Sequence, residues 1–227
     1  MCTPGNPTVL RGDTIRQAPR RIGERLPATA AGVARDTADI QRKDRTLMLR
    51  NTSTEYGLIT IALHWLVAVA TIGLFILGLW MTELDYYDAW YNRGPELHKG
   101  IGILLLIAVV LRLAWRWLDP IPGPEPTHAP WERRLGRITH AALYLLLITM
   151  MIAGYLISTA DGRPIDVFGL FSAPALISGL DNQEDIAGEI HELLAYALIG
   201  LAALHALAAL KHHFIDRDRT LGRMLGR

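Results

Sequence analysis

The sequence predicts an all-α integral membrane protein, a four-helix bundle preceded by a disordered N-terminal tail. Hydrophobic residues make up 51% of the 227-residue chain, and its mean hydropathy is positive. Four stretches are close to the length of about 20 apolar residues that crosses a hydrocarbon core. Basic residues are concentrated in alternate connections between those stretches, which is typical of a protein with several spans.

The beginning of the chain differs in composition from the rest. Residues 1–52 are rich in Arg, Asp, Thr, Pro and Ala, with no sustained apolar period and no apolar run long enough for a signal peptide. We expect residues 1–52 to form a disordered basic cytoplasmic tail and residues 53–227 to form the four-span domain. An alternative is that translation starts at Met48 and that the preceding residues are an artefact of start assignment.

The four predicted spans are Leu58–Trp80, Gly100–Leu118, Ile138–Ser158 and Ile190–Leu210. The second is the least regular, because Arg112 and Arg116 interrupt it. We expect both arginines to extend toward one membrane surface and anchor the helix there. A pairing of these arginines with the acidic groups of a cofactor is the alternative.

Two of the connections have distinctive compositions. Residues 119–130 contain repeated prolines, and we expect them to run as a stiff extended segment rather than a helix. Residues 159–189 form a long connection with Gly, Pro and acidic residues, and we expect it to cover the outer end of the bundle.

The distribution of basic residues predicts the orientation in the membrane. Ten of the 23 Lys and Arg residues lie in residues 1–50, five in 112–137 and five in 211–227, whereas residues 81–99 and 159–189 together hold three. The positive-inside rule then places both termini and the proline-rich connection in the cytoplasm. Tryptophans near the predicted boundaries are typical of an interfacial belt: Trp80, Trp90, Trp115, Trp117 and Trp131.

Five of the eight histidines lie within or at the ends of the predicted spans: His64, His98, His140, His191 and His205. His191 and His205 are fourteen residues apart, just under four helical turns, and so point from nearly the same face about 21 Å apart along the axis. Ionisable side chains in membrane helices are costly and usually functional. The alternative for any one of these histidines is a structural role, as a hydrogen-bonded residue that packs within the bundle.

Depth in the membrane pairs these histidines. His64 and His205 both lie toward the cytoplasmic side, and His98 and His191 both lie at the outer starts of their spans. Two level pairs at opposite depths suit two cofactors, each held by imidazoles from different helices. His140 is a second candidate partner for His64 by depth alone, but that pairing leaves His205 without a partner.

The ligand types favour haem over zinc. Neutral imidazole binds both iron and zinc, but a zinc site needs a tight cluster of three or four ligands. Here the ligands come as two distant pairs, with Glu192 beside His191 as the one neighbouring carboxylate. The single cysteine, Cys2, excludes internal disulfides, c-type haem attachment and cysteine-ligated clusters. Haems with two axial imidazoles transfer electrons.

Small residues near the histidines would let a porphyrin approach the backbone: Gly100, Gly102, Gly188 and Gly200. We expect His128, in the proline-rich connection, to be a surface residue. His212 and His213 end the fourth span, where a cation suits the C-terminus of a helix.

Five short segments form a specific combination: IALHW at 61–65, LHKG at 97–100, IHE at 190–192, LHALAALKHH at 204–213 and RDRTLGRM at 217–224. Together they resemble the bacterial cytochrome b561 family, over roughly residues 53–226, and most closely its di-haem, four-span branch that exchanges electrons with ubiquinone and superoxide. The resemblance implies a multi-pass protein of the bacterial inner membrane that holds two haem b groups with axial ligands His64, His98, His191 and His205. It also implies the pairs His64–His205 and His98–His191, with His140 not an axial ligand.

Three functions are compatible with these observations. The first is transmembrane electron transfer through two b-type haems linked to the quinone pool, in particular as a superoxide:ubiquinone oxidoreductase. The second is a cytochrome b membrane anchor for a dehydrogenase or hydrogenase, which requires a redox partner subunit. The third is a metal transporter that uses His ligands. Membrane lipid is an expected partner in every case, and nucleic acid in none.

Overall fold

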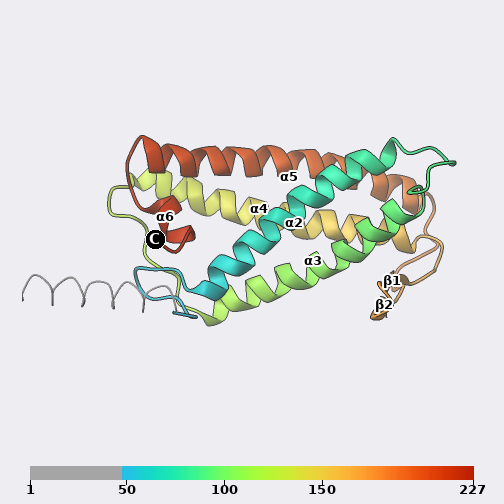
Figure 1. Ribbon diagram of the computed structural model, residues 1–227, viewed down its shortest axis with the longest axis horizontal. Coiled ribbons are helices and arrows are strands. Elements are labelled where there is room, and N and C mark those ends of the chain that lie inside the picture. Colours follow the sequence, from blue (N-terminus) through green and yellow to red (C-terminus); the bar gives the residue numbers. More distant parts are fainter. Residues whose placement is uncertain (1–47) are drawn as a thin grey trace, which may run out of the picture. The chain divides into compact units, whose positions relative to one another are not determined.

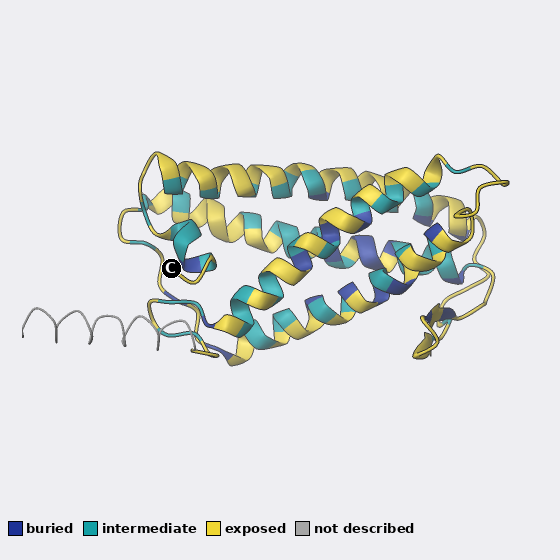
Figure 2. Ribbon diagram, in the orientation of Figure 1, coloured by how far each residue is buried: buried dark blue, intermediate teal, exposed yellow. Residues whose placement is uncertain are grey.

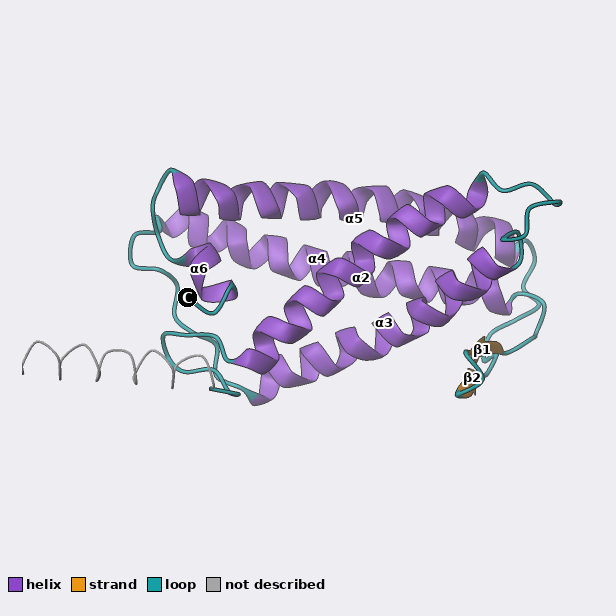
Figure 3. Cartoon of the chain, in the orientation of Figure 1, coloured by secondary structure: helices purple, strands orange, loops and turns teal. Residues whose placement is uncertain are grey.

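The computed structural model describes residues 48–227, so most of the predicted tail, 1–52, lies outside the described residues. The chain forms four long helices, α2 (Leu58–Thr82), α3 (Arg93–Leu118), α4 (Pro130–Thr159) and α5 (Gln183–Phe214), and a short C-terminal helix, α6 (Thr220–Met224). A small hairpin of β1 (Ile165–Val167) and β2 (Phe171–Ala173) lies between α4 and α5 (Figure 3).

The four long helices confirm the predicted spans. Within the described residues, α2, α3, α4 and α5 are long and apolar enough to cross a membrane. Three of them begin earlier than predicted, at Arg93, Pro130 and Gln183. The prediction counted only apolar residues, whereas a helix continues through polar residues wherever its backbone hydrogen bonds can still form.

The helices run side by side along one long direction (Figure 1). α2 packs closely on α3 and α4 packs closely on α5, while contacts between α3 and α4 join the two pairs. α5 makes only loose backbone contact with α2. We name the two ends of the bundle by what lies there. The proline-loop end holds residues 119–129 and α6, and the hairpin end holds β1 and β2.

The centre of the bundle contains buried side chains from all four long helices: Val67, Leu74, Leu105, Val109, Leu147, Met150, Met151 and Leu198. Most other apolar side chains on these helices face outward, which leaves the outer surfaces largely exposed in Figure 2. Leu145 and Leu193, for example, are 68% and 70% exposed. A continuous apolar surface of this kind suits contact with lipid.

The segment before α2 closes the proline-loop end. The backbone carbonyl of Met48 accepts the N–H of Leu58 at 2.9 Å, which satisfies one of the free N–H groups at the start of a helix. A Cβ at residue 57 would collide with the backbone of Arg50, so Gly57 permits this close return of the chain.

Residues 48–52, the end of the predicted tail, also make specific contacts. Arg50 Nε donates to Asp119 Oδ1 at 2.7 Å, and the backbone N–H of Asn51 donates to Asp119 Oδ2 at 2.7 Å. Asp119 follows the last residue of α3 and its side chain is fully buried. The segment is therefore tied to the end of α3 by a buried carboxylate.

The long connection between α4 and α5 covers the start of α3, as expected, but it does so through a β-hairpin that the sequence did not predict. The turn of the hairpin places Phe168 and Gly169 at positive φ, 56° and 70°. A Cβ at Gly100 would lie 2.6 Å from Cζ of Phe168. The ring of Phe168 therefore rests directly on the backbone of α3, which explains why residue 100 is glycine.

Candidate functional site

At the hairpin end, the structure brings His98 of α3 and His191 of α5 together. Their ring centroids are 6.1 Å apart and the ring planes are inclined at 70°. Both side chains are half-buried and come from helices that do not pack closely on each other.

Backbone groups and a glycine of α4 position His191. Its Nδ1 lies 2.9 Å from the carbonyl oxygen of Met150. A carbonyl can only accept, so Nδ1 carries the proton and donates it, which leaves Nε2 with a free lone pair. A Cβ at Gly154 would lie 2.9 Å from Cε1 of His191. The missing side chain at Gly154 is thus what lets the imidazole reach this carbonyl.

His98 also packs against a glycine of a neighbouring helix, but within residues 48–227 its Nδ1 lacks the hydrogen bond that His191 has. A Cβ at Gly78 of α2 would lie 3.3 Å from Cε1 of His98, so the ring packs against the backbone of α2. Nδ1 of His98 is buried and has no hydrogen-bond partner among the described residues. A buried polar atom without a partner usually points to a missing group or to a strained site.

At the proline-loop end, three histidines from three helices meet. The ring centroids of His64 (α2) and His205 (α5) are 6.5 Å apart with planes inclined at 75°. His140 of α4 lies beside His205, at 5.1 Å between centroids. His64 and His205 are half-buried, whereas His140 is exposed. The neighbour that the structure gives His140 is therefore His205, not His64.

The separations of the two expected pairs suit a shared metal. A bond from imidazole nitrogen to a metal is about 2.0 Å, so two imidazoles on opposite sides of one ion have ring centres about 6 Å apart. The distances of 6.1 Å for His98–His191 and 6.5 Å for His64–His205 agree with this value. The 5.1 Å of His140–His205 is too short for it.

α5 makes only loose backbone contact with α2, the helix that carries His64. Between the two pairs, Phe75 of α2 and Tyr196 of α5 meet edge to face at 5.7 Å. This aromatic contact joins α2 to α5 where their backbones do not pack closely.

The direction of the Arg112 side chain contradicts the expectation that this residue anchors α3 at the membrane surface. Its side chain turns into the bundle, where Nε donates to the hydroxyl of Tyr144 at 2.8 Å and Nη2 lies 3.0 Å from Nδ1 of His64. Its Nη1 is buried and has no partner among the described residues. The inward direction has a physical reason: His64 and Tyr144 offer acceptors to a cation that would otherwise meet only apolar side chains.

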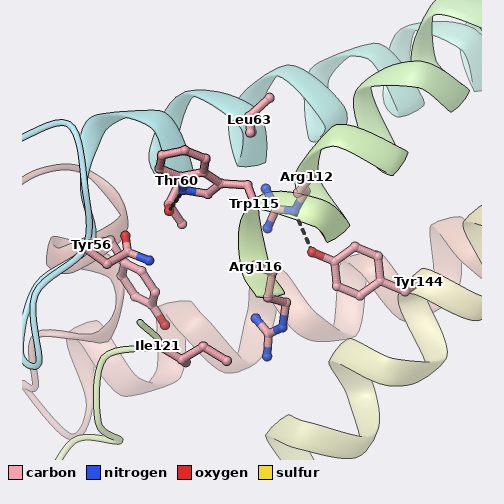
Figure 4. Close-up of a pocket in the computed structure, with 9 residues that line it drawn as sticks. Tyr56, Thr60, Leu63, Arg112, Trp115, Arg116, Ile121 and Tyr144 are labelled. Carbon is pink, nitrogen blue, oxygen red and sulfur yellow. Dashed lines mark hydrogen bonds between the residues drawn. The ribbon is translucent and has the colours of Figure 1, made fainter. Parts of the chain in front are cut away.

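A pocket opens beside Arg112 at the proline-loop end (Figure 4). Side chains of α2, α3 and α4 and of the adjoining loops line it: Asn51, Tyr56, Thr60, Leu63, Arg112, Trp115, Arg116, Ile121 and Tyr144. The indole N–H of Trp115 donates to the hydroxyl of Thr60 at 3.1 Å, which fixes one wall. Arg116 lines this pocket together with Arg112, and Arg112 is also within 3.0 Å of His64.

The glycines important for the histidines differ from those expected. A Cβ at Gly102, Gly188 or Gly200 would meet nothing within 4 Å, and Gly100 accommodates Phe168 instead. Gly78 and Gly154, which no sequence pattern indicated, are the glycines that face His98 and His191. They lie on helices other than those carrying the histidines they contact, so spacing along one helix cannot reveal them.

The expectation that His128 is a surface residue is wrong. Its side chain is only 15% exposed, and Nε2 lies 2.8 Å from Oδ2 of Asp218. His212 stacks on it, with ring centroids 4.3 Å apart. His212 lies in the last turn of α5, seven residues after His205, whereas His128 comes from the proline-rich connection, and the two form a cluster that includes none of the four paired histidines.

Comparison with known proteins places these features in one family. The family described as prokaryotic cytochrome b561 matches residues 55–227. The chain is 53% identical to "Cytochrome b561 homolog 2" of Escherichia coli (strain K12) over 177 residues, 78% of this chain and 94% of that protein. It is 31% identical to "Probable superoxide oxidase CybB" of Yersinia pestis over 176 residues, 75% of this chain and 96% of that protein. It is 28% identical to "Cytochrome b562" of Cereibacter sphaeroides over 176 residues, 75% of this chain and 94% of that protein.

The family match covers all four long helices, both histidine pairs and α6. The four candidate spans are those of a haem-containing membrane protein of this kind. The chain belongs to the prokaryotic cytochrome b561 family, and is a four-span membrane cytochrome.

Proposed function

We propose that the protein transfers electrons across the membrane through two b-type haems, one held by His98 and His191 and the other by His64 and His205. The observation that carries this proposal is the separation of the two pairs, 6.1 and 6.5 Å between ring centroids at opposite ends of the bundle. A b-type haem held by two imidazoles would supply single-electron transfer at each of these sites.

The residues around each pair have distinct tasks in this proposal. Met150 accepts the Nδ1 proton of His191, which fixes the tautomer that offers Nε2 as a ligand. In contrast, Nδ1 of His64 faces Arg112 and must act as an acceptor there. For His64 to ligate through Nε2 as neutral imidazole, its proton moves to Nδ1 and the contact with Arg112 opens.

Arg112 is then available for another acceptor. Its Nη1 is buried and unpaired among the described residues, and Arg116 lines the same pocket. Two guanidinium groups beside the pair His64–His205 suit the two carboxylates of a porphyrin, because arginine binds carboxylates through paired hydrogen bonds. This assignment replaces the anchoring role for Arg112.

We further propose that the proline-loop end faces the cytoplasm and that ubiquinone exchanges electrons with the protein. The orientation is supported by the basic residues of that end, which outnumber those of the hairpin end. Reduction of one ubiquinone to quinol takes up two electrons, passed singly, and two protons from water.

Superoxide as the electron donor is the finer hypothesis, and it rests on the relative named "Probable superoxide oxidase CybB". In that reaction two superoxide anions each lose one electron and become oxygen. Residues 81–99 and 159–192, which include the hairpin end, contain eleven acidic and only three basic residues. This excess of negative charge should slow the association of superoxide with that end of the protein. Such a surface repels an anion, and the repulsion weakens as salt screens it.

Haem content and vectorial electron transfer test the proposal. The purified protein should contain two extractable haem b per chain, both low-spin and titrating as two redox components. In liposomes with ferricyanide enclosed and quinol added outside, the protein should oxidise quinol, and an otherwise identical liposome without protein should not. One haem per chain, or a high-spin spectrum, would contradict the four-ligand assignment.

The same preparation distinguishes a superoxide-dependent enzyme from a membrane anchor and from a metal transporter. A superoxide-dependent reduction of ubiquinone that speeds up with ionic strength would support the donor hypothesis, whereas no reduction at any salt concentration would exclude it. Stoichiometric copurification of a soluble redox subunit would favour the membrane-anchor function. Colourless protein that accumulates divalent metal in liposomes would favour a transporter.

A further inference from the structure

Three segments meet in a second histidine cluster beyond the membrane-spanning part of the proline-loop end. His128 comes from the proline-rich connection, His212 from the last turn of α5, and Asp218 from the segment before α6. His128 Nε2 lies 2.8 Å from Asp218 Oδ2, and His212 Nδ1 lies 3.4 Å from the same oxygen. The cluster is separate from both spanning pairs and has no part in the proposed electron transfer.

The positions of the three ligand atoms suit a tetrahedral metal ion. One nitrogen from each histidine and the carboxylate oxygen all lie within 4.8 Å of one another. Ligands about 2.0 Å from a tetrahedral zinc ion are about 3.3 Å from each other. The 3.4 Å contact already has this length, and the 2.8 Å contact needs to open by only about half an ångström to reach it.

The three side chains are largely buried, which strengthens their electrostatic interaction with a bound cation. The side chain of Asp218 is 2% exposed, and those of His128 and His212 are 15% and 14% exposed. The two ring centroids lie 4.3 Å apart with planes inclined at 33°, so the rings of His128 and His212 lie against each other. The remaining exposure of the two histidines leaves a path from solvent for an ion.

A neighbouring group of possible ligands is less suitable. Glu132, His212 and Asp216 also lie close enough to hold an ion. The ammonium group of Lys211, however, lies 2.9 Å from Glu132 and 2.7 Å from Asp216. That cation already neutralises both carboxylates, whereas no lysine or arginine among the described residues forms an ion pair with Asp218.

We propose that His128 Nε2, His212 Nδ1 and Asp218 Oδ2 bind one divalent transition-metal ion of the zinc class, with water as the fourth ligand. Two imidazoles and one carboxylate are a common ligand set for such an ion. The ion displaces two protons, the one that His128 Nε2 shares with Asp218 and the one that His212 Nδ1 shares with Asp216 at 2.7 Å, and both protons pass to water. It joins the proline-rich connection to the end of α5 and to the C-terminal segment, and so has a structural role.

The test uses the haem-loaded, tag-free protein with Zn²⁺ as the probe. After exposure to Zn²⁺ and removal of free ion, the wild type should retain one zinc per chain in addition to haem iron. X-ray absorption at the zinc edge should show two imidazole ligands and oxygen at about 2.0 Å. His128→Asn and His212→Asn should each weaken zinc binding at least tenfold, because losing even a group that supports a metal ligand typically costs about 10–100-fold.

His213→Asn is the matched control, because His213 is adjacent to His212 but is not part of the cluster. It should bind zinc as the wild type does, and unchanged haem spectra in all variants would show that each is folded. Failure of the wild type to retain zinc would overturn the proposal and show that the cluster is held by hydrogen bonds alone. Equal zinc retention by His128→Asn and His213→Asn would overturn it as well. Neither result would affect the haem assignment.

Discussion

Gly154 of α4 lies so close to His191 of α5 that any side chain at residue 154 would meet the imidazole. A Cβ there would be 2.9 Å from Cε1 and 3.0 Å from Nδ1 of the ring. The same ring nitrogen donates to the carbonyl of Met150, one turn earlier in α4. A single methyl group therefore decides whether the imidazole keeps its orientation.

Gly154→Ala should displace His191 and weaken the hairpin-end haem site. The ring must shift by several tenths of an ångström, which lengthens or breaks its hydrogen bond to Met150. Loss of such a supporting contact typically lowers metal-site affinity by about 10–100-fold. Haem content and the spectrum after mild detergent washing measure the effect. Gly136→Ala, at an exposed position of the same helix with open space around it, is the control and should keep both haems.

His98→Ala and His191→Ala should each remove the hairpin-end haem and leave the other bound. The two residues lie at the opposite end of the bundle from His64 and His205, so their loss opens one site only. A haem-to-chain ratio that falls from two to one, with one redox component remaining, is the expected result. Loss of both haems in a variant whose four-helix content is intact would refute independent sites.

His205→Phe should lose the proline-loop-end haem, whereas His140→Phe should keep both haems low-spin. The ring of His205 is 6.5 Å from that of His64, the separation that suits two axial ligands, and His140 is exposed beside His205. Optical and electron paramagnetic resonance spectra of the two variants distinguish the roles. The reverse pattern, with haem loss only in His140→Phe, would make His140 the ligand.

Arg112→Gln should lower the midpoint potential of the proline-loop-end haem. A positive charge beside a haem stabilises its reduced form, because reduction adds an electron, and removing that charge makes reduction less favourable. A partly buried charge at this range is worth a few tens of millivolts, by the order of magnitude of Coulomb energies in proteins. Potentiometric titration measures the shift. Arg137→Gln, an exposed arginine of α4, is the control, and an equal shift in both variants would exclude a specific role for Arg112.

Asp119 should contribute a pH-dependent part of the stability. Burial raises the pKa of this carboxyl, but the hydrogen bonds from Arg50 and from the backbone of Asn51 outweigh burial and hold the pKa below its ordinary value. Its contribution is therefore present at neutral pH and is lost as the pH falls through the lowered folded-state pKa. Asp119→Asn should melt at a lower temperature than the wild type at neutral pH.

The acid range provides the check on this prediction. The difference in melting temperature between wild type and Asp119→Asn should shrink once the pH falls below about 4, near the ordinary pKa of aspartate. Tryptophan fluorescence in detergent can follow unfolding across that range. A difference that stays constant down to the lowest pH would mean that the ionised carboxylate of Asp119 does not stabilise the fold.

The sequence determined the spans and the histidines because both leave local signals. Lengths of apolar residues identified all four membrane helices, and repeated prolines identified the non-helical connection after α3. The depth of each histidine followed from its position in a span and from the alternation of span direction. Those regularities also grouped His64 with His205 and His98 with His191, which the bundle brings to 6.5 and 6.1 Å.

Only the tertiary structure decided how side chains of different helices meet. Gly78 and Gly154 face histidines on neighbouring helices. Arg112 turns inward because His64 of α2 and Tyr144 of α4 provide hydrogen-bond acceptors there. The cluster of His128 and Asp218 joins residues 90 positions apart. Periodicity along a chain fixes which face of a helix a residue occupies, but the rotation and distance between helices are set by packing of the whole bundle, so these partners emerge only when the chain is folded.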